Sequence, residues 1–362
     1  MSSNLSVMRV IALDVGTGTQ DVLLYDTSLV TENNVKMVMP SQTAIVANRI
    51  KSVTEQGRSL FLCGETMGGG PSSAAVRAHL QGGYSVFATP LAARTLNDDL
   101  DKVRSWGVKI TAAQPKTDCV RIEMNDVDVP ALKSALQQFD VSLPTMCAVA
   151  CQDHGESSGS NRIFRFQHFK HLIATGGELT NFCYVDGRIP NYLTRLKAVY
   201  RTLGQEEMQR ILVMDTGPAA ILGALCDDEA AKHAWEPHII VNVGNGHTLA
   251  AMLDQKKIIG MFEHHTSLIT TEKLDYFLSL FMDGKLTNER IFQDGGHGCY
   301  IHETGYREID RAFRERGFWV TTIGPQRGIM KKSRLSPYFA APGGDMMLAG
   351  CFGLVTGFNS LV

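Results

Sequence analysis

Two segments far apart in the chain share one pattern of hydrophobic and polar positions. In residues 10–25, and again in residues 239–253, a short apolar run leads into a polar turn with two glycines, and a second apolar run follows. This pattern predicts a β-hairpin whose turn depends on the backbone freedom of glycine. Consecutive backbone N–H groups in such a turn form a concave site for phosphate oxygens. Two hairpins of this kind predict two lobes that hold one polyphosphate between them.

The polar and glycine residues of these turns are the first candidate site residues. Asp14 ends the first apolar strand, where its carboxylate could hold a metal-bound water beside a phosphate. The alternative is that Asp14 stabilises its own turn. The turn residues could likewise contact phosphate or serve the turn alone. The candidates for phosphate contact are Gly16, Thr17, Gly18, Gly244, Asn245, Gly246 and His247.

The remaining pattern predicts strands alternating with helices, which is typical of an α/β fold whose sheets are covered by helices. The Gly- and Ser-rich composition of residues 153–161 predicts a loop. The polar residues 228–237 are expected to cross between the lobes. The expected lobes are residues 1–230 and 231–362. Expected strands span 9–14, 21–26, 59–63, 84–89, 119–123, 145–151, 211–215, 238–243, 247–253, 257–263 and 318–323. Expected helices span 91–106, 130–139, 162–174, 192–203, 214–224 and 272–282.

Composition narrows the class of protein. The chain has 362 residues, 44% of them hydrophobic and 20% charged, with a formal net charge of −2. This charge and the single compact basic cluster, residues 331–334, do not indicate a nucleic-acid partner. No apolar stretch reaches the ~20 residues of a membrane helix, so no membrane partner is expected. Residues 1–6 lack the features of a signal peptide, and the sequence therefore predicts a cytoplasmic protein.

The eight cysteines are scattered, several within apolar runs, which fits a reducing compartment better than a disulfide scaffold. Cys147 and Cys151 are the one closely spaced pair, and their four-residue spacing places both on one face of a predicted strand. A third cysteine three residues further would complete an iron–sulfur motif, but that position holds His154. The sequence therefore predicts no iron–sulfur cluster.

The two glycine turns resemble the phosphate-1 and phosphate-2 motifs of the actin-like ATPase superfamily, which includes sugar kinases, heat-shock chaperones and actin. In the family's order, residues 214–224 resemble its first connecting helix, whose small residues let two helices cross closely at a hinge. Residues 341–350 resemble its adenosine motif. The resemblance implies a two-lobed, ribonuclease H-like α/β fold with an interlobe cleft.

This resemblance implies ATP as the bound nucleotide, with Mg²⁺ held by Asp14 and adenosine bordered by Gly343, Gly344 and Asp345. It further implies Mg²⁺-dependent phosphotransfer or ATP hydrolysis, with an unidentified small-molecule acceptor as the other partner. The oligomeric state is not predicted. One position departs from the sugar-kinase pattern: Asp21 stands where many of these kinases have Lys or Arg. The carboxylate of Asp21 would there face a phosphate of the nucleotide, and the two negative charges would repel each other unless Mg²⁺ lies between them.

More narrowly, three phrases resemble a bacterial and archaeal family labelled pyruvate formate-lyase activating enzyme-like. They are residues 64–71, with their three consecutive glycines, residues 152–155 and residues 295–298. The glycine run could be a substrate loop or a plain connector. The activity of that family is not established, so this resemblance implies kinship rather than a reaction.

Several further side chains could do chemistry. Asp153 and His154 follow a predicted strand, in a position that suits a general base, although Asp153 could equally hydrogen-bond its own turn. Neutral imidazoles also bind Zn²⁺ or Fe²⁺, and some actin-like relatives bind iron in the cleft. His168 and His171 have a spacing that places them near one helix face, where packing is the more usual role. The candidate metal-binding residues in or beside glycine-rich loops and strand ends are His154, His247, Glu263, His264, His265 and His297.

Three functions follow from these patterns. The first is an ATP-binding enzyme in which Asp153 or His154 activates the acceptor or water. The second is a non-catalytic nucleotide switch, which Asp21 in place of a basic residue favours slightly. The third is a metalloenzyme that uses the loop histidines.

Overall fold

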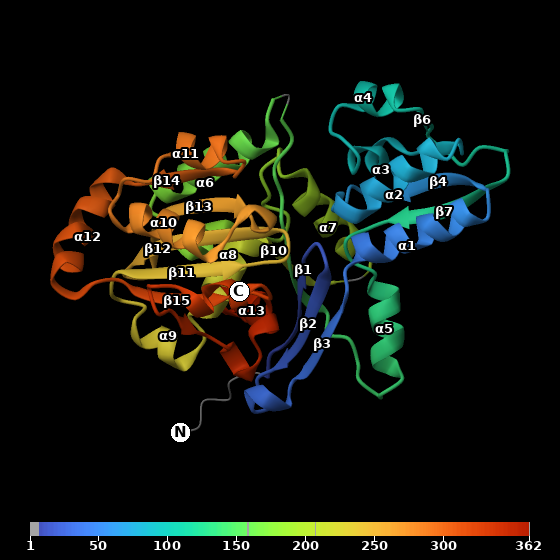
Figure 1. Ribbon diagram of the computed structural model, residues 1–362. Helices are drawn as coiled ribbons and strands as arrows, with labels where there is room; N and C mark the ends of the chain where they lie inside the picture. Colours follow the sequence, from blue (N-terminus) through green and yellow to red (C-terminus); the bar gives the residue numbers. More distant parts are fainter. Residues whose placement is uncertain (1–6, 158, 207, 362) are drawn as a thin grey trace.

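A computed structural model describes residues 7–157, 159–206 and 208–361 of the protein. The N-terminal residues considered above for targeting lie outside this range. Two six-stranded sheets and one four-stranded sheet form the described structure. In Figure 1 the second six-stranded sheet lies at the left, the four-stranded sheet at the upper right, and the first hairpin between them.

The first sheet has the strand order β3-β2-β1-β8-β10-β9. Strands β1, β2 and β3 pair antiparallel, whereas β8 and β10 extend the sheet in parallel with β1. The strands are β1 (Arg9–Val15), β2 (Thr19–Asp26), β3 (Val35–Pro40), β8 (Met146–Cys151), β9 (Cys183–Val185) and β10 (Arg210–Met214).

The second sheet repeats this arrangement in the order β14-β13-β12-β11-β15-β16. Its first three strands in the chain again pair antiparallel, and β15 and β16 again extend the sheet in parallel. Without the additional strands β9 and β14, the strands of each sheet, numbered along the chain, follow the order 3-2-1-4-5. This is the repeat of the predicted two-lobed, ribonuclease H-like actin fold. The strands are β11 (His238–Val243), β12 (His247–Asp254), β13 (Lys257–His265), β14 (Gly298–Ile301), β15 (Trp319–Ile323) and β16 (Tyr338–Phe339).

A smaller α/β unit is inserted between β3 and β8. Its sheet has the order β6-β5-β4-β7, and all its neighbouring strands are parallel. It has an apolar core of its own, which includes Ile50, Leu62 and Val86. The strands are β4 (Ser59–Gly64), β5 (Val86–Ala88), β6 (Val108–Ile110) and β7 (Cys119–Met124). The helices of the unit are α1 (Gln42–Glu55), α2 (Gly70–Gln81), α3 (Pro90–Arg94) and α4 (Leu100–Ser105). Helix α5 (Val129–Gln137) follows the unit in the chain and packs through Val129 and Leu132 into the core of the first sheet.

One helix prediction in this unit is wrong in detail, and helix α2 was not predicted. The helix expected over 91–106 is divided into α3 and α4, because the side chain of Asp99 accepts the N–H groups of Asp101 and Lys102 and begins a new helix. The glycine run, considered above as a substrate loop or a connector, leads into the unpredicted helix α2, whose first turn contains Pro71. The expectation that Pro130 occupies a first helical turn is confirmed in α5.

The other helices cover the two large sheets. The predicted crossing at 228–237 contains a short helix, α9. These helices are α6 (Asn161–Ala174), α7 (Thr194–Gln205), α8 (Thr216–Ala224), α9 (Asp228–Lys232), α10 (Thr271–Met282), α11 (Asn288–Gln293), α12 (Glu303–Arg316) and α13 (Ala349–Leu361). Short 3₁₀ turns are η1 (Thr31–Asn33), η2 (Leu179–Phe182), η3 (Thr266–Leu268), η4 (Arg327–Lys332), η5 (Pro342–Gly344) and η6 (Met346–Leu348).

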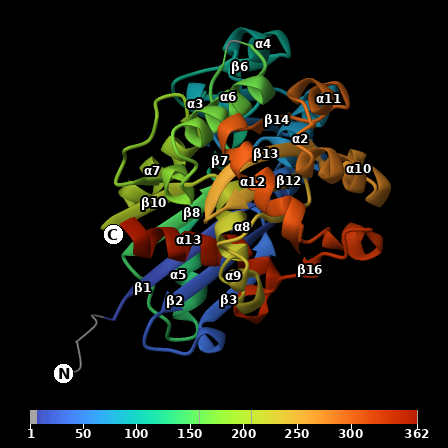
Figure 2. The same ribbon diagram turned by 90° about the vertical axis from the view of Figure 1, so that its left-hand side faces the viewer.

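Helices α8 and α13 cross closely between the two large sheets, as Figure 2 shows. A Cβ atom at Gly223 would lie 1.6 Å from the carbonyl oxygen of Ala349, and one at Gly353 would lie 1.9 Å from that of Ala219. Glycine on both helices is therefore what permits backbone contact. The predicted close crossing of small residues is confirmed.

The boundary proposed at residue 230 stays a prediction. Helix α13, which it assigns to the second lobe, packs against β1 and β8 of the first sheet as well as against α8. One apolar cluster contains Ala12 of the first sheet, Ile240 of the second and Phe358 of α13. Among the described residues, no helix is both long and apolar enough to cross a membrane.

Candidate functional site

Each glycine turn is closed by a backbone hydrogen bond. The N–H of Gly16 donates to the carbonyl of Thr19, and the N–H of Gly244 donates to the carbonyl of His247, both at 2.9 Å. The residues between these pairs therefore lie at the tips of the hairpins β1–β2 and β11–β12. A Cβ atom at Gly244 would lie 2.8 Å from the carbonyl oxygen of His247, so glycine is required here by the turn itself.

The two tips meet at a cavity of about 470 Å³ between the sheets. A Cβ atom at Gly18 would lie 3.3 Å from Nδ2 of Asn245, and one at Gly246 would lie 3.2 Å from Oγ1 of Thr17. Small residues at the tips therefore set the width of the cleft. The sequence-predicted residues that line the cavity are Asp14, Gly16, Thr17, Asp153, His154, Gly244, Asn245, Gly246 and His247.

Four of the residues predicted to contact phosphate or adenosine, Gly18, Gly343, Gly344 and Asp345, are not among the residues that line this cavity. The carbonyl of Gly343 accepts a hydrogen bond from Nζ of Lys36 at 2.9 Å. The side chain of Asp345 accepts the N–H of Met347 at 3.0 Å, and so begins η6. Gly343 is thus directed toward the edge strand β3. The rest of the predicted adenosine segment does line the cavity, through Met346, Met347, Ala349 and Gly350. Its role beside adenosine stays a prediction.

A different glycine segment, which the sequence analysis missed, does line the cavity. Residues 323–325 follow the end of β15, beside the second glycine turn. Gly324 has a φ of +96°, and a Cβ atom there would lie 2.4 Å from the carbonyl oxygen of Val243. The sequence contained a signal for it, because a strand pattern that ends in Gly-Pro marks a turn at the edge of a sheet.

Asp14 and Asp21 form an acidic pair on the floor of the cavity. They stand opposite each other on β1 and β2, so both side chains lie on one face of the sheet. Burial raises the pKa of Asp14 to about 7, although Oγ1 of Thr216 donates a hydrogen bond to its carboxylate at 2.6 Å. Burial and the neighbouring charge of Asp14 raise the pKa of Asp21 to about 8.

The geometry of this pair fits a divalent cation. Oδ1 of Asp21 is buried and has no hydrogen-bond partner among the described residues. Carboxylate oxygens are the ligands that Mg²⁺ prefers, and a cation between two carboxylates would remove their repulsion. Asp14 and Asp21 are therefore the residues that would hold Mg²⁺ in this cleft.

We expect Asp21→Asn to stabilise the protein at pH 8.5 in the presence of a chelator, by about 2 kcal/mol. Both aspartates have pKa values above the ~3.9 of the unfolded chain, so the folded protein binds more protons between about pH 4 and pH 8 and loses stability as the pH rises. The advantage of the variant should therefore shrink toward pH 5. Urea unfolding at several pH values measures it.

The exposed Asp140→Asn variant is the matched control for this substitution and should leave stability unchanged. Adding Mg²⁺ at pH 8.5 should raise the melting temperature of the unmodified protein more than that of Asp21→Asn. An Asp21→Asn variant that is less stable than the unmodified protein at pH 8.5 without divalent cations would contradict the acidic pair.

The contacts of Asp153 fit the alternative in which its carboxylate hydrogen-bonds its own turn. It is buried, and its two carboxylate oxygens accept the N–H of Gly155 at 2.8 Å and the N–H of Leu196 at 2.9 Å. Burial nevertheless raises its pKa to about 6, against these hydrogen bonds. Asp153 thus fixes the loop after β8 to the first turn of α7, and a role as general base stays a prediction.

Two loop histidines, His154 and His247, line one wall of the cavity, and the buried His297 lies next to both. His154 follows β8, His247 begins β12 and His297 precedes β14, and their ligand atoms lie within 4.8 Å of one another. Burial lowers the pKa of His247 to about 4 and holds that of His154 well below its usual value. At neutral pH these two imidazoles are therefore uncharged.

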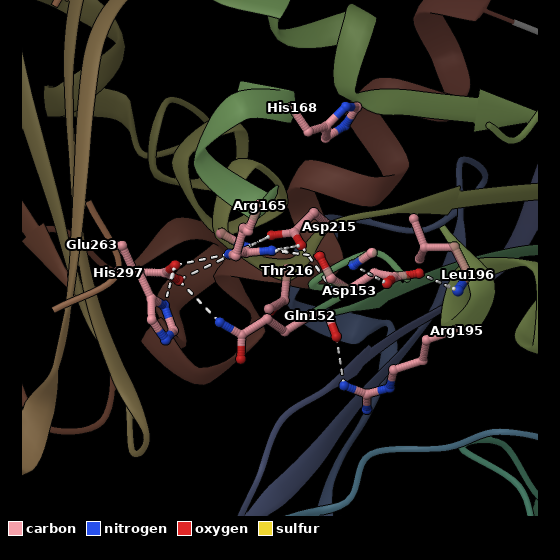
Figure 3. A network of polar contacts seen from close by, with 12 residues as sticks. Gln152, Asp153, Arg165, His168, Arg195, Leu196, Asp215, Thr216, Glu263 and His297 are labelled. Atoms are coloured by element: carbon pink, nitrogen blue, oxygen red, sulfur yellow. Dashed lines mark hydrogen bonds and ion pairs between the residues drawn. The ribbon is translucent and has the colours of Figure 1, made fainter. Parts of the chain in front are cut away.

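A buried charge network supports this wall (Figure 3). Nδ1 of His297 lies 2.7 Å from Oε2 of Glu263, which accepts a hydrogen bond from Nε of Arg165 at 2.8 Å. Arg165 also donates to Asp215 at 2.5 and 2.9 Å. Burial would raise the pKa of Glu263, but the Arg165 guanidinium and His297 hold it well below its usual range.

Sequence analysis named Glu263 but missed Arg165 and Asp215. Arg165 is 2% exposed on α6, next to the buried face formed by Phe166, Phe169 and Ile173. A cation beside an apolar stripe is a weak signal, because long cationic side chains usually extend to solvent from such positions. The partner carboxylates are far away in the chain, so the ion pair itself left no local pattern.

His265 also lines the cavity, with its ring centroid 4.9 Å from that of His247 and 4.8 Å from that of His297, but it is not one of the three histidines whose ligand atoms converge. The other histidines considered have different contacts. His168 lies between the hydroxyl groups of Tyr192 and Tyr184, at 3.1 and 3.0 Å, whereas His171 is exposed. The contacts of His168 therefore fit the packing role that was considered for His168 and His171. Nε2 of His264 lies 3.0 Å from Oδ2 of Asp294, outside the cavity lining.

Cys147 and Cys151 lie on one face of β8 in the same apolar cluster, as their spacing predicted. Burial raises the pKa of Cys147 to about 12 and that of Cys151 well above its usual value. Both therefore stay thiols at neutral pH. In the part of the chain that the structure describes, no three cysteines gather in one place.

Comparisons with known proteins add the following. A search of curated proteins finds no match. Ethanolamine utilization protein EutJ from Carboxydothermus hydrogenoformans aligns at 11% identity and a TM-score of 0.36, covering 97% of this chain and 90% of its own. MreB5 of Spiroplasma citri bound to ADP aligns at 10% identity and a TM-score of 0.37, covering 98% and 97%.

A Bacteroides thetaiotaomicron protein with actin-like ATPase fold and unknown function aligns at 8% identity and a TM-score of 0.37, covering 97% of this chain and 98% of its own. The repeated strand order, rather than these distant alignments, identifies the fold. Residues 67–328, well over half of the chain, match the family described as "Putative pyruvate format-lyase activating enzyme (DUF1786)", and the chain therefore belongs to that family.

Proposed function

We propose that the interlobe cavity binds a nucleotide such as ATP, with its phosphates between the two glycine turns. The observation that supports this most is the meeting of the two tips, Gly18 with Asn245 and Gly246 with Thr17, at one cavity between two repeated sheets. Backbone N–H groups in such turns favour phosphate oxygens. Asp14 and Asp21 would hold Mg²⁺ beside them, and the metal would neutralise phosphate charge.

We further propose that the nucleotide is hydrolysed or its γ-phosphate transferred, with the acceptor unidentified. Of the two residues considered for activating it, His154 fits better than Asp153. Its imidazole lines the cavity and is neutral, whereas both oxygens of Asp153 already accept backbone N–H groups. The rest of catalysis would be positioning by the two turns and exclusion of water as the lobes close.

A non-catalytic nucleotide switch is the second candidate, and one observation favours it. Both arginines that line the cavity are already paired, Arg94 with Glu156 and Arg195 with Asp126. Neither is therefore free to stabilise charge on a transferring phosphoryl group. Measuring phosphate release under steady-state conditions separates turnover from binding alone.

The activity in the family's description is not part of this proposal. A radical activating enzyme holds its iron–sulfur cluster on three cysteine thiolates. Cys147 and Cys151 are buried thiols in β8, and His154 stands at the third position of the motif. That the protein has no such cluster stays a prediction.

Calorimetric titration with ATP and ADP in the presence of Mg²⁺ tests the proposed binding. We expect binding by the unmodified protein and at least tenfold weaker binding, a loss of about 1.4 kcal/mol, by Gly246→Val. A valine there would separate the tips, because its Cβ would already lie 3.2 Å from Oγ1 of Thr17. Gly246 is a sharper probe than Gly244, where a side chain would disrupt the turn.

The control is Gly328→Val, at an exposed glycine with no atom within 4 Å of an added Cβ, and it should bind nucleotide normally. Equal affinities of Gly246→Val and the unmodified protein would contradict phosphate binding between the turns. So would the absence of heat with either nucleotide at millimolar concentration.

A further inference from the structure

We propose that His154, His247 and His297 bind one transition-metal ion, of the Zn²⁺ or Fe²⁺ type, on the wall of the cavity. The three residues come from three separate loops or strand ends, yet their ligand atoms lie within 4.8 Å of one another. The ring centroid of His297 lies 4.6 Å from that of His247 and 5.2 Å from that of His154. This site is distinct from the acidic pair at Asp14 and Asp21, and it does not depend on nucleotide binding.

The ring of His297 is oriented as a metal ligand would be. Its Nδ1 lies 2.7 Å from Oε2 of Glu263, which fixes the imidazole and leaves Nε2 for the metal. Metal-ligating histidines generally donate their second ring N–H to a carboxylate in this way. Glu263 is itself held by Arg165 and by Nε2 of Gln152 at 3.0 Å, so the ligand is anchored through two layers of side chains.

The other two rings have nitrogen atoms to offer. Among the hydrogen bonds of the described residues, none involves the side chain of His154 or His247. Both rings are only half-buried and line the cavity, so an ion could reach them. If the three imidazoles only packed against one another, the ring nitrogens of His154 and His247 would have no partner among the described residues. A bound ion explains better why the three rings converge.

Charge and donor type indicate which metal fits. Glu263, Asp215 and Arg165 together have a net charge of −1, which a nearby dication would offset. Neutral imidazole nitrogen suits Zn²⁺ and Fe²⁺, whereas Mg²⁺ and Ca²⁺ prefer oxygen. With Zn–N bonds of about 2.0–2.1 Å the nitrogens must lie roughly 3.3 Å apart, so modest rotations of the side chains would close the site.

Three protein ligands leave a coordination position that faces the cavity. Structural zinc sites are closed by four protein ligands, whereas sites with three histidines keep a position for water or substrate. The turn that contains His247 also contains Asn245 and Gly246, at the tip of the second hairpin. The open position would therefore lie beside the place proposed for phosphates. As a metal ligand, His154 would not itself activate the acceptor, and a metal-bound water could act as the nucleophile instead.

Metal binding by the full chain, purified without a metal-affinity tag and stripped with a chelator, tests this inference. We expect titration with Zn²⁺ alone to show one equivalent bound, and Zn²⁺ at 100-fold its dissociation constant to stabilise the protein by about 2.7 kcal/mol. Co²⁺ should produce visible absorption bands of nitrogen-coordinated metal. His154→Ala and His247→Ala should each weaken Zn²⁺ binding by on the order of 100-fold or more.

His171→Ala is the matched control, because this histidine is exposed on α6 and should leave Zn²⁺ affinity unchanged. Because His154 and His247 are half-buried, their alanine variants should fold, and their thermal melts without metal show whether they do. Should either variant fail to fold, Zn²⁺ stoichiometry and the Co²⁺ spectrum of the unmodified protein decide alone. Failure of the unmodified protein to bind Zn²⁺ or Fe²⁺, or unchanged affinity in both folded variants, would overturn the proposal.

Discussion

Gly223→Ala should destabilise the protein by about 3–4 kcal/mol, although it adds a single methyl group. The new Cβ would lie 1.6 Å from the carbonyl oxygen of Ala349 and 2.5 Å from its carbonyl carbon. These are backbone atoms, so no side-chain rotation can make room. Helices α8 and α13 would have to separate, and both pack against the sheets that form the cleft.

The matched control adds the same methyl group to another helix. Gly204 lies in α7, and no atom lies within 4 Å of an added Cβ. Gly204→Ala should therefore stabilise the protein by about 0.5–1 kcal/mol, as alanine does in helices. Urea unfolding of the two variants provides the comparison. A Gly223→Ala variant as stable as the unmodified protein would mean that the two helices do not cross as closely as described.

Arg165→Met should cost about 3–5 kcal/mol of stability, because it removes one member of a buried ion network and leaves its partners without compensation. Glu263 is 2% exposed and Asp215 7% exposed, so water cannot replace the guanidinium. Methionine keeps much of the apolar length of the side chain, and the loss therefore reports charge and hydrogen bonds rather than volume.

The pH dependence gives this prediction a sign. In the unmodified protein the pKa of Glu263 is lowered, so its contribution to stability is present above the ~4.3 of an unfolded glutamate and is lost as the pH falls further. Without Arg165, burial alone would raise that pKa. The stability difference between the two proteins should then decrease as the pH is lowered from 8 to 5.

Arg104→Met is the control for this substitution, since the exposed pair of Arg104 with Asp101 should contribute less than about 1 kcal/mol. A small, pH-independent loss in Arg165→Met would contradict the network. So would a loss no larger than that of the control.

The fold could be predicted in outline because its signals are local. The glycine hairpins and the small residues of α8 are each recognisable from a few consecutive residues. In each case the backbone must turn sharply or approach a second backbone segment closely. The division of 91–106 into two helices was missed because one capping aspartate, Asp99, outweighed a continuous helical pattern. Helix α2 was missed because Gly68, Gly69 and Gly70 disfavour a helix that Pro71 then permits.

The candidate site was predictable only in part, because it is assembled from distant segments. Local spacing identified Asp14 and the turn glycines, of which Gly16, Gly244 and Gly246 line the cavity together with Asp14. No spacing could show that His154, His247 and His297 converge, since tertiary packing alone brings their loops together. The same holds for Asp21, whose opposition to Asp14 follows from strand register. Gly324 was not considered, because the resemblance to the adenosine motif pointed to residues 341–350.

The most direct measurement of nucleotide binding is a crystal structure with a non-hydrolysable ATP analogue and Mn²⁺ in place of Mg²⁺. The anomalous signal of Mn²⁺ locates the cation independently of the nucleotide density. We expect phosphates between the tips at Gly18 and Gly246, and a manganese peak beside Asp14 and Asp21. An empty cleft at saturating analogue, or a nucleotide bound away from both glycine turns, would contradict the proposed function.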